Sequence, residues 1–230
     1  MEFRNSLSKS RQIEDFDNFL LNSYLKFVLR HLVEEVCSKC FQFQFYCILG
    51  VPFGEVSFVK EWLKVSGSVE QPARQHPKKP VKGLDSTRRE ISGQRFYTFF
   101  QQLCGGPEDF FKNCLVYNHC PLMFVSESGK NLTPPDLKIE TRNTLLKLCD
   151  ETLVSVLDLF AVKHIIALGR YAEARAKKVV FRSGKRNIKV HFMVHPSPAS
   201  AIANRGWSQL AQSALEKADL LDIIKGESVP

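Results

Sequence analysis

The chain has 230 residues, of which 44% are hydrophobic and 24% charged, and its formal net charge at pH 7 is +8. This composition and length suit one globular domain with a sizeable core, which excludes wholesale disorder. No uncharged apolar run reaches the ~18 residues of a membrane span, and residues 1–15 lack the apolar block of a secretory signal. We therefore expect neither of these segments.

The positive charge is concentrated in two segments. Residues 1–49 are neutral in sum, so the surplus lies beyond them, over residues 74–89 and residues 170–189. Clustered basic residues of this kind are typical of a protein that binds a polyanion. The alternative is a solvated basic surface without a ligand.

Few regular elements are predicted before residue 93. Apolar residues recur at three- and four-residue spacing over residues 13–36, which predicts a helix. Residues 41–46 (FQFQFY) alternate between apolar and polar, which predicts a strand. A short helix is expected over residues 55–65. Residues 66–92 are rich in proline, glycine, lysine and arginine, which predicts a long surface loop.

Strands and helices alternate in the remainder of the chain. The expected strands are three short apolar stretches, over residues 113–118, 163–168 and 187–195, and the first is followed by a polar loop. The expected helices cover residues 93–103, residues 136–160 after a Thr-Pro-Pro-Asp cap, the stretch after Gly169, and residues 207–220. This alternation indicates an α/β fold with a parallel sheet covered by helices on both faces.

Three candidate functional residues follow predicted or possible strands, namely Phe53, Asn118 and His195. Ligands bind at the carboxyl ends of the strands in an open parallel sheet. A phenyl ring, an amide and an imidazole can together stack on a planar ring, bond its polar edge and stabilise a developing negative charge. Each residue also has a simpler interpretation, with Phe53 in the core, Asn118 forming a turn and His195 in a loop.

Five stretches carry a resemblance to a known family. They are VPFGEVSFVKEWL (51–63), HPKKPVKGL (76–84), SGQRFYTFFQQLCG (92–105), VYNHCPLMFVSESGKNLTPPDL (116–137), and HPSP with NRGW (195–207). These stretches resemble the single-strand-selective monofunctional uracil-DNA glycosylases of base-excision repair. The resemblance divides the chain into an atypical N-terminal segment (residues 1–49), a glycosylase-like domain (residues 50–225) and a tail (residues 226–230).

The resemblance implies a three-layer α/β/α fold with a central parallel sheet. It also implies that uracil or oxidised uracil is flipped out of DNA and that its N-glycosidic bond is hydrolysed, without a metal or cofactor. Phe53 matches the family's aromatic stacker, and Asn118 matches the amide that reads the Watson–Crick edge. His195 matches the histidine that stabilises the charge on the departing base.

The resemblance further implies how DNA is held. The segment after His195 matches a wedge that enters the base stack, with the candidate residues Pro196, Ser197, Pro198, Ala199, Ser200 and Arg205. The candidate phosphate contacts are Lys78, Lys79, Arg170, Lys185 and Arg186. The expected partner is uracil-containing DNA, single- or double-stranded. We expect a monomer that acts in the nucleus.

The N-terminal segment departs from the family. The family carries a glycine-rich GMNPGPFG segment whose asparagine activates the attacking water, and this chain contains no Asn-Pro pair. Residues 41–49 stand before the first matching stretch and could form a strand in the place of the family's first core strand. Two interpretations therefore remain, an active glycosylase and a catalytically silent or misfolded variant that at most binds DNA.

The seven cysteines favour reduced thiols over a disulfide framework, because they are odd in number and lie among apolar residues. Cys37 and Cys40 have the spacing of half a zinc site. No second pair with this spacing occurs in the sequence, so a metal site is not expected.

Overall fold

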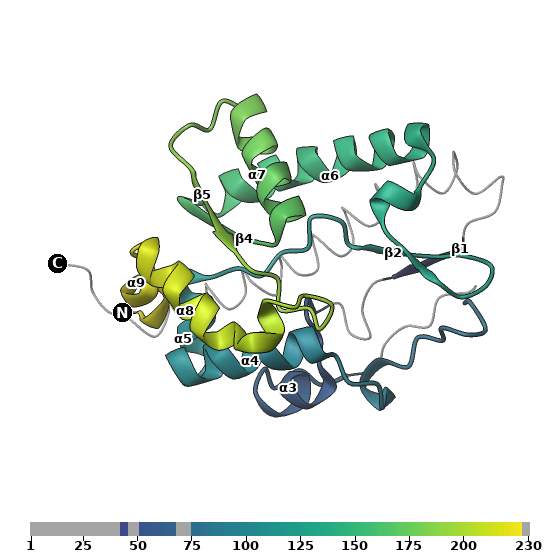
Figure 1. The fold of residues 1–230 in the computed structure, drawn as a ribbon, viewed down its shortest axis with the longest axis horizontal. Coiled ribbons are helices and arrows are strands. Elements are labelled where there is room, and N and C mark those ends of the chain that lie inside the picture. The colour runs from purple at the N-terminus through teal and green to yellow at the C-terminus, as the bar shows by residue number, and fades with distance from the viewer. Residues whose placement is uncertain (1–41, 46–50, 68–74, 227–230) are drawn as a thin grey trace.

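The computed structural model describes residues 42–45, 51–67 and 75–226, whose elements are drawn in Figure 1. The helices are α3 (Val56–Glu61), α4 (Ile91–Cys104), α5 (Pro107–Asn113), α6 (Ile139–Leu159), α7 (Arg170–Arg182), α8 (Trp207–Lys217) and α9 (Leu221–Lys225). The strands are β1 (Gln42–Phe45), β2 (Leu122–Val125), β3 (Asn131–Leu132), β4 (His164–Leu168) and β5 (Lys189–Met193). Three short 3-10 helices are η2 (Gly83–Asp85), η3 (Pro134–Asp136) and η4 (Ala203–Arg205).

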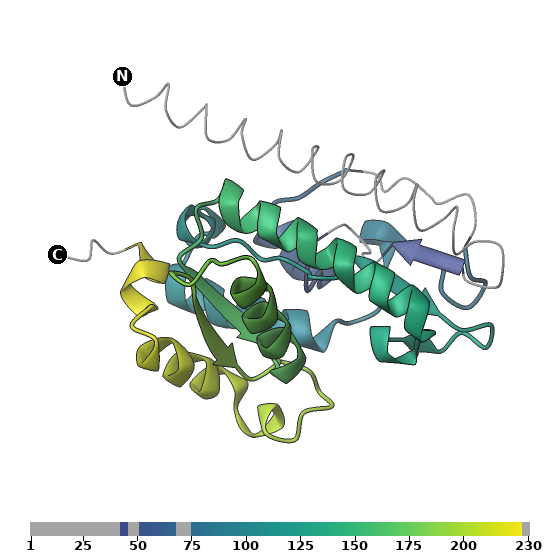
Figure 2. The same cartoon turned by 90° about the horizontal axis from the view of Figure 1, so that it is seen from above.

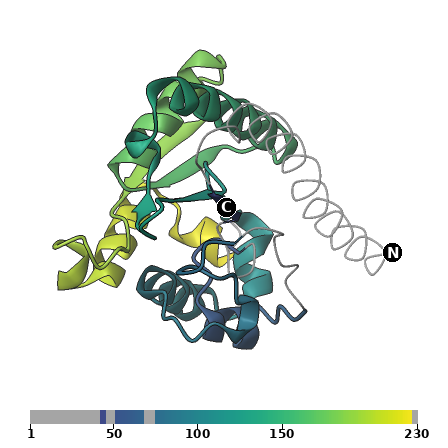
Figure 3. The ribbon, with the colours of Figure 1, turned by 90° about the vertical axis from the view of Figure 1, so that its right-hand side faces the viewer.

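Strands β4 and β5 form a parallel pair, in register from His164 opposite Lys189 to Leu168 opposite Met193. Because side chains alternate along a strand, the pair contributes to two separate parts of the core. Ile165 packs with buried residues of α6 and α7, whereas its neighbour Ile166 packs with those of α4 and α8. Helices therefore cover both faces of this pair, as Figure 3 shows.

Strands β1, β2 and β3 form a separate antiparallel sheet. Gln42 pairs with Val125 and Phe45 with Leu122, and β2 returns into β3 through the turn at residues 126–130. Figures 1 and 2 place this sheet at one end of the long axis, with β4 and β5 toward the other end. The strand predicted over residues 41–46 is thus confirmed, but its pairing is with β2. The described part of this stretch does not join the parallel pair.

Two expectations for residues 113–132 are wrong. Residues 114–118 are extended, but they join neither of the described sheets, so the predicted strand does not form. The loop expected after them contains β2 and β3, because the apolar residues Leu122, Phe124 and Val125 are buried. Within the described ranges the parallel sheet therefore has two strands, instead of the larger central sheet that was expected.

The predicted helices agree with the structure in α3, α4, α6, α7 and α8, with boundaries that differ by a few residues. The Thr133–Asp136 capping box is present, but it caps η3, and α6 begins after it. Helix α5 was not predicted; it begins with Pro107 and carries two acidic residues in its first turn, which suits a helix N-terminus. The helix predicted over residues 13–36 lies outside the described residues.

Helix α4 supplies the aromatic centre of the main core. Its four core rings, each at most 5% exposed, are Phe96, Tyr97, Phe99 and Phe100. They contact aromatic rings from three other parts of the chain, namely Trp62, Phe110 and Trp207. Burial of large aromatic side chains contributes roughly 1.5–3 kcal/mol each, so α4 is a rigid base for whatever its first turns contact.

Candidate active site

Phe53 adopts a strained backbone conformation beside the first turn of α4. Its φ is 58°, an outlier for a bulky residue. The neighbouring carbonyl of Pro52 accepts a hydrogen bond from the Tyr97 hydroxyl at 2.7 Å, and the Phe53 carbonyl accepts one from the Glu55 amide at 2.7 Å. A Cβ atom added at Gly93 would lie 2.0 Å from the Phe53 carbonyl oxygen, so this close approach requires glycine.

The ring of Phe53 forms a stacked pair with a core ring of α4. Its centroid lies 4.9 Å from that of Phe96, with an interplanar angle of 12°. The His195 ring lies 5.8 Å away from Phe53, tilted by 50°. The structure therefore brings Phe53 and His195 together from opposite ends of the matched region, as the sequence predicted.

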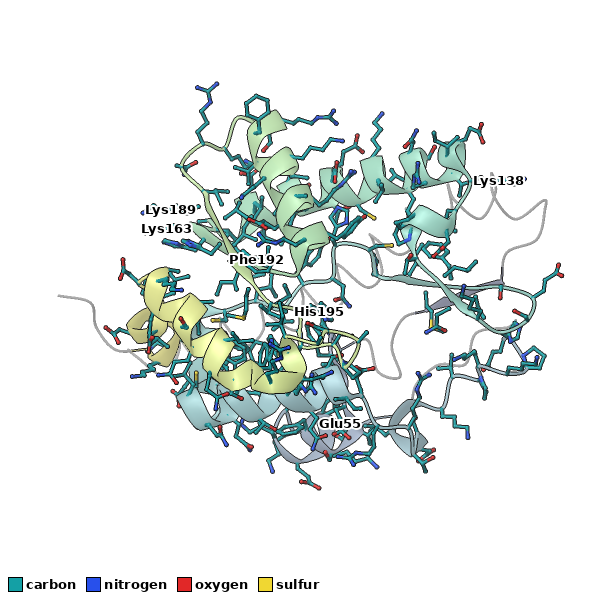
Figure 4. All side chains as sticks on the ribbon, viewed as in Figure 1. Glu55, Lys138, Lys163, Lys189, Phe192 and His195 are labelled. Atoms are coloured by element: carbon teal, nitrogen blue, oxygen red, sulfur yellow. The ribbon has the colours of Figure 1, made fainter. Side chains whose placement is uncertain are left out.

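His195 follows β5, where the chain leaves the parallel pair (Figure 4). The backbone amide of Ser197 donates a hydrogen bond to its Nδ1 at 3.1 Å. Since Nδ1 is an acceptor, the proton of the neutral ring lies on Nε2, which is then available as a donor. Burial lowers the pKa of His195, opposed by the negative charge of Glu90, so the ring is neutral at pH 7.

The segment after His195 is held on both sides. The Trp207 indole donates a hydrogen bond to the Val194 carbonyl at 2.7 Å, which ties the start of α8 to the end of β5. From α4, the Arg95 guanidinium donates to the carbonyl oxygens of Pro196 and Ser197 at 3.1 and 3.4 Å. The predicted wedge is therefore a preformed loop, which Figures 2 and 3 show projecting from the body of the molecule.

The predicted wedge residues differ in exposure. Pro196 is buried, whereas Pro198, Ala199 and Arg205 are exposed. Ser197 and Ser200 are half-buried, and their hydroxyls accept hydrogen bonds from backbone amides of the same loop. The two serines therefore shape the loop from within.

Asn118 ends the extended 114–118 segment and is half-buried. Among the described residues no hydrogen bond to its side-chain amide is found. Cys114 and Val116, earlier in the segment, pack on the same core cluster as Phe53. The convergence of Asn118 on Phe53 and His195 stays a prediction.

The residue after Asn118 is tied to α6 and α7. His119 Nε2 lies 3.0 Å from Asp150 Oδ1, and the two oxygens of Asp150 also accept from Arg175 at 2.6 and 2.7 Å. Arg175 and Asp150 are only 14% and 16% exposed. This network fixes the chain beside Asn118 and turns His119 toward α6.

The predicted phosphate contacts in the second basic segment lie at two ends of the parallel pair. Arg170 begins α7, directly after β4, at the same end as His195. Lys185 and Arg186 precede β5 at the other end, where Figure 4 shows Lys163 and Lys189. Lys185 also forms an ion pair with Asp158. Arg170 thus shares an end with His195, and Lys185 and Arg186 do not.

Lys78 and Lys79 belong to a loop that is fastened to the β2–β3 turn. The buried His76 places its Nε2 at 3.1 Å from the Glu127 carbonyl oxygen, and the Lys78 ammonium donates to the Ser128 carbonyl at 3.2 Å. These contacts attach part of the predicted long loop to the antiparallel sheet.

In the described ranges, no group of three or more histidine, cysteine, aspartate or glutamate side chains is placed to hold a metal ion. Nor do these ranges include a helix with the length and apolar character needed to cross a membrane. Cys37 and Cys40 lie outside the described residues.

Several residues with roles in the site's geometry were not singled out from the sequence. They are Glu90, Gly93, Arg95 and Tyr97 of α4 and its cap, and Trp207 of α8. All lie within or beside the matched motifs SGQRFYTFF and NRGW, so the resemblance indicated the two segments but not the single residues. Their individual contacts depend on which turns of α4 face residues 52–55 and 195–197, which the pattern alone does not specify.

No family model matches the chain. Three curated relatives share 43–44% identity with it. The single-strand selective monofunctional uracil-DNA glycosylase of Rattus norvegicus is 44% identical over 178 residues, which are 77% of this chain and 64% of that protein. The protein of the same name from Mus musculus is 44% identical over 77% of this chain and 63% of its own length. The one from Bos taurus is 43% identical over 76% and 64%.

A solved structure is similar in fold. The crystal structure of wild-type Pedobacter heparinus SMUG2 superposes with a TM-score of 0.55, over 76% of this chain and 69% of that one, at 18% sequence identity. The chain thus shares a mixed helix and strand fold with this protein, and it spans a little under two thirds of the length of the three mammalian relatives. The resemblance seen in the motifs is confirmed, because the curated homologues of this chain are single-strand selective monofunctional uracil-DNA glycosylases.

Proposed function

We propose that this chain is a monofunctional DNA glycosylase that removes uracil from DNA during repair. The observation that carries the proposal is the Phe53–His195 pair, with ring centroids 5.8 Å apart and an imidazole whose free nitrogen is a donor. The relatives' names state the same activity for proteins with 43–44% identity. Neither these names nor the site geometry favours the catalytically silent alternative.

The base would be bound by stacking and by an amide. One face of the Phe53 ring is covered by Phe96, so an extruded base would use the other face, for about 1–3 kcal/mol of stacking. The Asn118 amide would accept from uracil N3–H and donate to O4. Cytosine presents the opposite pattern at these atoms, so an amide fixed in this orientation discriminates against it.

His195 would stabilise the leaving group. When the bond between the sugar C1′ and uracil N1 breaks, its electron pair stays with the base, and negative charge develops on uracil O2. The Nε2–H of a neutral His195 would donate to that oxygen. Water would then add to C1′, as in a hydrolytic mechanism that forms no covalent link to the enzyme.

We further propose a three-layer α/β/α fold with a central parallel sheet, of which β4 and β5 are the described strands. Support comes from the helices on both faces of β4 and β5. The expected DNA partner, single- or double-stranded, is supported by the basic segments, since phosphate contacts give affinity without sequence preference. We propose a monomer that works in the nucleus, where its substrate is found.

Single-turnover release of uracil from an oligonucleotide, single-stranded and duplex, tests the proposal. We expect release by the parent chain and a loss of at least about a hundredfold in His195→Leu, because one well-placed donor contributes that much. His191→Leu is the matched control, since His191 lies in β5, the strand that His195 follows, and pairs with His164 at 3.1 Å. A folded parent that releases no uracil from either substrate overturns the proposal.

A further inference from the structure

The loop between His195 and α8 exposes one large apolar side chain. Ile202 is 57% exposed, whereas the other exposed positions at the loop tip are proline, alanine, asparagine and arginine. Single exposed apolar residues are common on protein surfaces, so exposure alone carries no inference. The loop that carries Ile202, however, is held in place by several hydrogen bonds.

Side-chain hydrogen bonds of Arg95 and Asn204, here called the clamp, fix the loop that carries Ile202. The Arg95 guanidinium, which already holds the Pro196 and Ser197 carbonyls, also donates to Asn204 Oδ1 at 2.8 Å. The side-chain Nδ2 of Asn204 in turn donates a hydrogen bond to the Pro198 carbonyl at 2.9 Å. One arginine of α4 and one asparagine of η4 thus bind both ends of the loop.

The backbone of the loop adds further restraint. The Ser200 amide donates to the Ser197 carbonyl at 3.0 Å, and the Asn204 amide donates to the Ser200 carbonyl at 3.1 Å. The Arg205 amide closes a turn on the Ile202 carbonyl at 3.1 Å. Ile202 therefore projects from a loop whose conformation is set before any ligand binds, and little conformational entropy remains to be lost on binding.

We propose that Ile202 is the side chain that enters the DNA base stack when uracil leaves it, and that Arg95 is the positioning residue that holds it out. This inference rests on the proposed function. Flipping a base costs a few kcal/mol, which an apolar side chain inserted between base steps offsets by filling the vacated space. Ala199 and Ser200 are too small to fill that space.

Ile202 should matter more for duplex DNA than for single-stranded DNA. In a duplex, the vacated position lies between stacked neighbours, so the wedge side chain adds to the stability of the flipped state. A uracil in a flexible single strand has little stack to leave, so the wedge contributes little. Loss of Ile202 should therefore reduce activity on duplex DNA selectively.

The experiment measures single-turnover uracil release from duplex and single-stranded oligonucleotides of the same sequence, with 2-aminopurine beside the uracil to report unstacking. For Ile202→Ala we expect the duplex rate to fall by about tenfold and the single-strand rate to stay within about twofold. The 2-aminopurine signal in the duplex should fall with the rate. Ile139→Ala is the matched control, because Ile139 begins α6 and is 59% exposed.

Arg95 and its partner Asn204 are each tested by one substitution. Arg95→Lys removes the fork that bonds three acceptors, and Asn204→Ala removes one arm of the clamp while leaving α4 intact. Both should lower the ratio of duplex to single-strand rates, and both should speed hydrogen exchange of amides 197–205. Arg89→Gln is the control, since the described hydrogen bond of Arg89 is to Gln94 and not to the loop.

The outcomes separate the inference from the function on which it rests. If the folded parent chain releases uracil from neither substrate, the proposed function is overturned. An active parent whose Ile202→Ala variant loses both rates equally, or neither, overturns the role of Ile202. Exchange of residues 197–205 that is unchanged in folded Arg95→Lys overturns the clamp.

Discussion

The two flanks of the candidate site are held in different ways. The stacking side, residues 51–55 and 194–207, is bonded to α4 and α8 by Tyr97, Arg95 and Trp207. The amide side, residues 114–120, is extended without a strand partner in the described ladders. Its polar anchor is the network of His119, Asp150 and Arg175.

The difference extends to strand pairing among the described residues. The family's first core strand is missing from the motifs of this chain, and among the described residues β4 pairs with β5 alone. The stacking side is held by hydrogen bonds to α4 and α8, whereas the amide side is held by the side chains of His119, Asp150 and Arg175.

The largest expected effect is on the amide side. Arg175→Met should lower the free energy of unfolding by about 3 kcal/mol, because Asp150 would be left largely buried without its strongest partner. Urea denaturation measures this change. Lys147→Met is the control: Lys147 is 77% exposed in its pair with Glu151, and its loss should cost under about 0.5 kcal/mol. Equal losses in the two variants would contradict the anchoring role.

On the stacking side, Gly93→Ala should lower the free energy of unfolding by about 2 kcal/mol. The added methyl group would meet the Phe53 carbonyl oxygen at 2.0 Å, so α4 and residues 52–55 must separate. The near-ultraviolet circular dichroism of the Phe53–Phe96 region should change with it. Gly106→Ala, whose added Cβ would approach its nearest neighbour, a carboxylate oxygen of Glu108, only to 3.2 Å, should have a smaller effect. A silent Gly93→Ala variant would show that the close approach is not required.

The sequence predicted the stacking side better than the amide side. Phe53 and His195 were placed together because both follow motif-defined strand ends, and the periodic helices α4 and α6 were recognised from their apolar faces. The strand expected over residues 113–118 failed because an apolar stretch shows burial but not its hydrogen-bond partner. The β2–β3 hairpin was missed because its turn, residues 126–130, is polar and its strands are short.

The contacts of single polar residues could not be predicted either. Arg89 lies just before α4 and Arg95 lies within it, yet Arg95 bonds the loop after His195 whereas Arg89 bonds Gln94. Which arginine faces the loop depends on the packing of α4 against α8 and β5. Lys185 and Arg186 lie at the opposite end of the parallel pair from His195, because basic clusters in the sequence do not state which end of a strand they occupy, and their role as phosphate contacts stays a prediction.

A smaller effect concerns the protonation of His195. Glu90 raises the pKa of His195 against the lowering by burial, so Glu90→Gln should move this pKa further down. Because protonation of Nδ1 breaks the bond from the Ser197 amide, the acid limb of the single-turnover rate should shift to lower pH in this variant. NMR titration of the His195 ring measures the pKa directly. Glu55→Gln, at the cap of α3, is the control, and an upward shift in Glu90→Gln would contradict the assignment.

The smallest expected effect is a difference in reactivity between two thiols of the amide side, Cys114 and Cys120. Burial raises the pKa of Cys114 to about 12, whereas a hydrogen bond from the Cys149 thiol lowers the pKa of Cys120. Since the thiolate is the reactive form, Cys120 should be alkylated by iodoacetamide at pH 8 before Cys114, as followed by mass spectrometry of peptides. Cys149→Ala should reduce this preference. Faster alkylation of Cys114 in the folded protein would mean that residues 114–118 open more readily than 119–122, so that the missing ladder and not the His119 anchor governs the amide side.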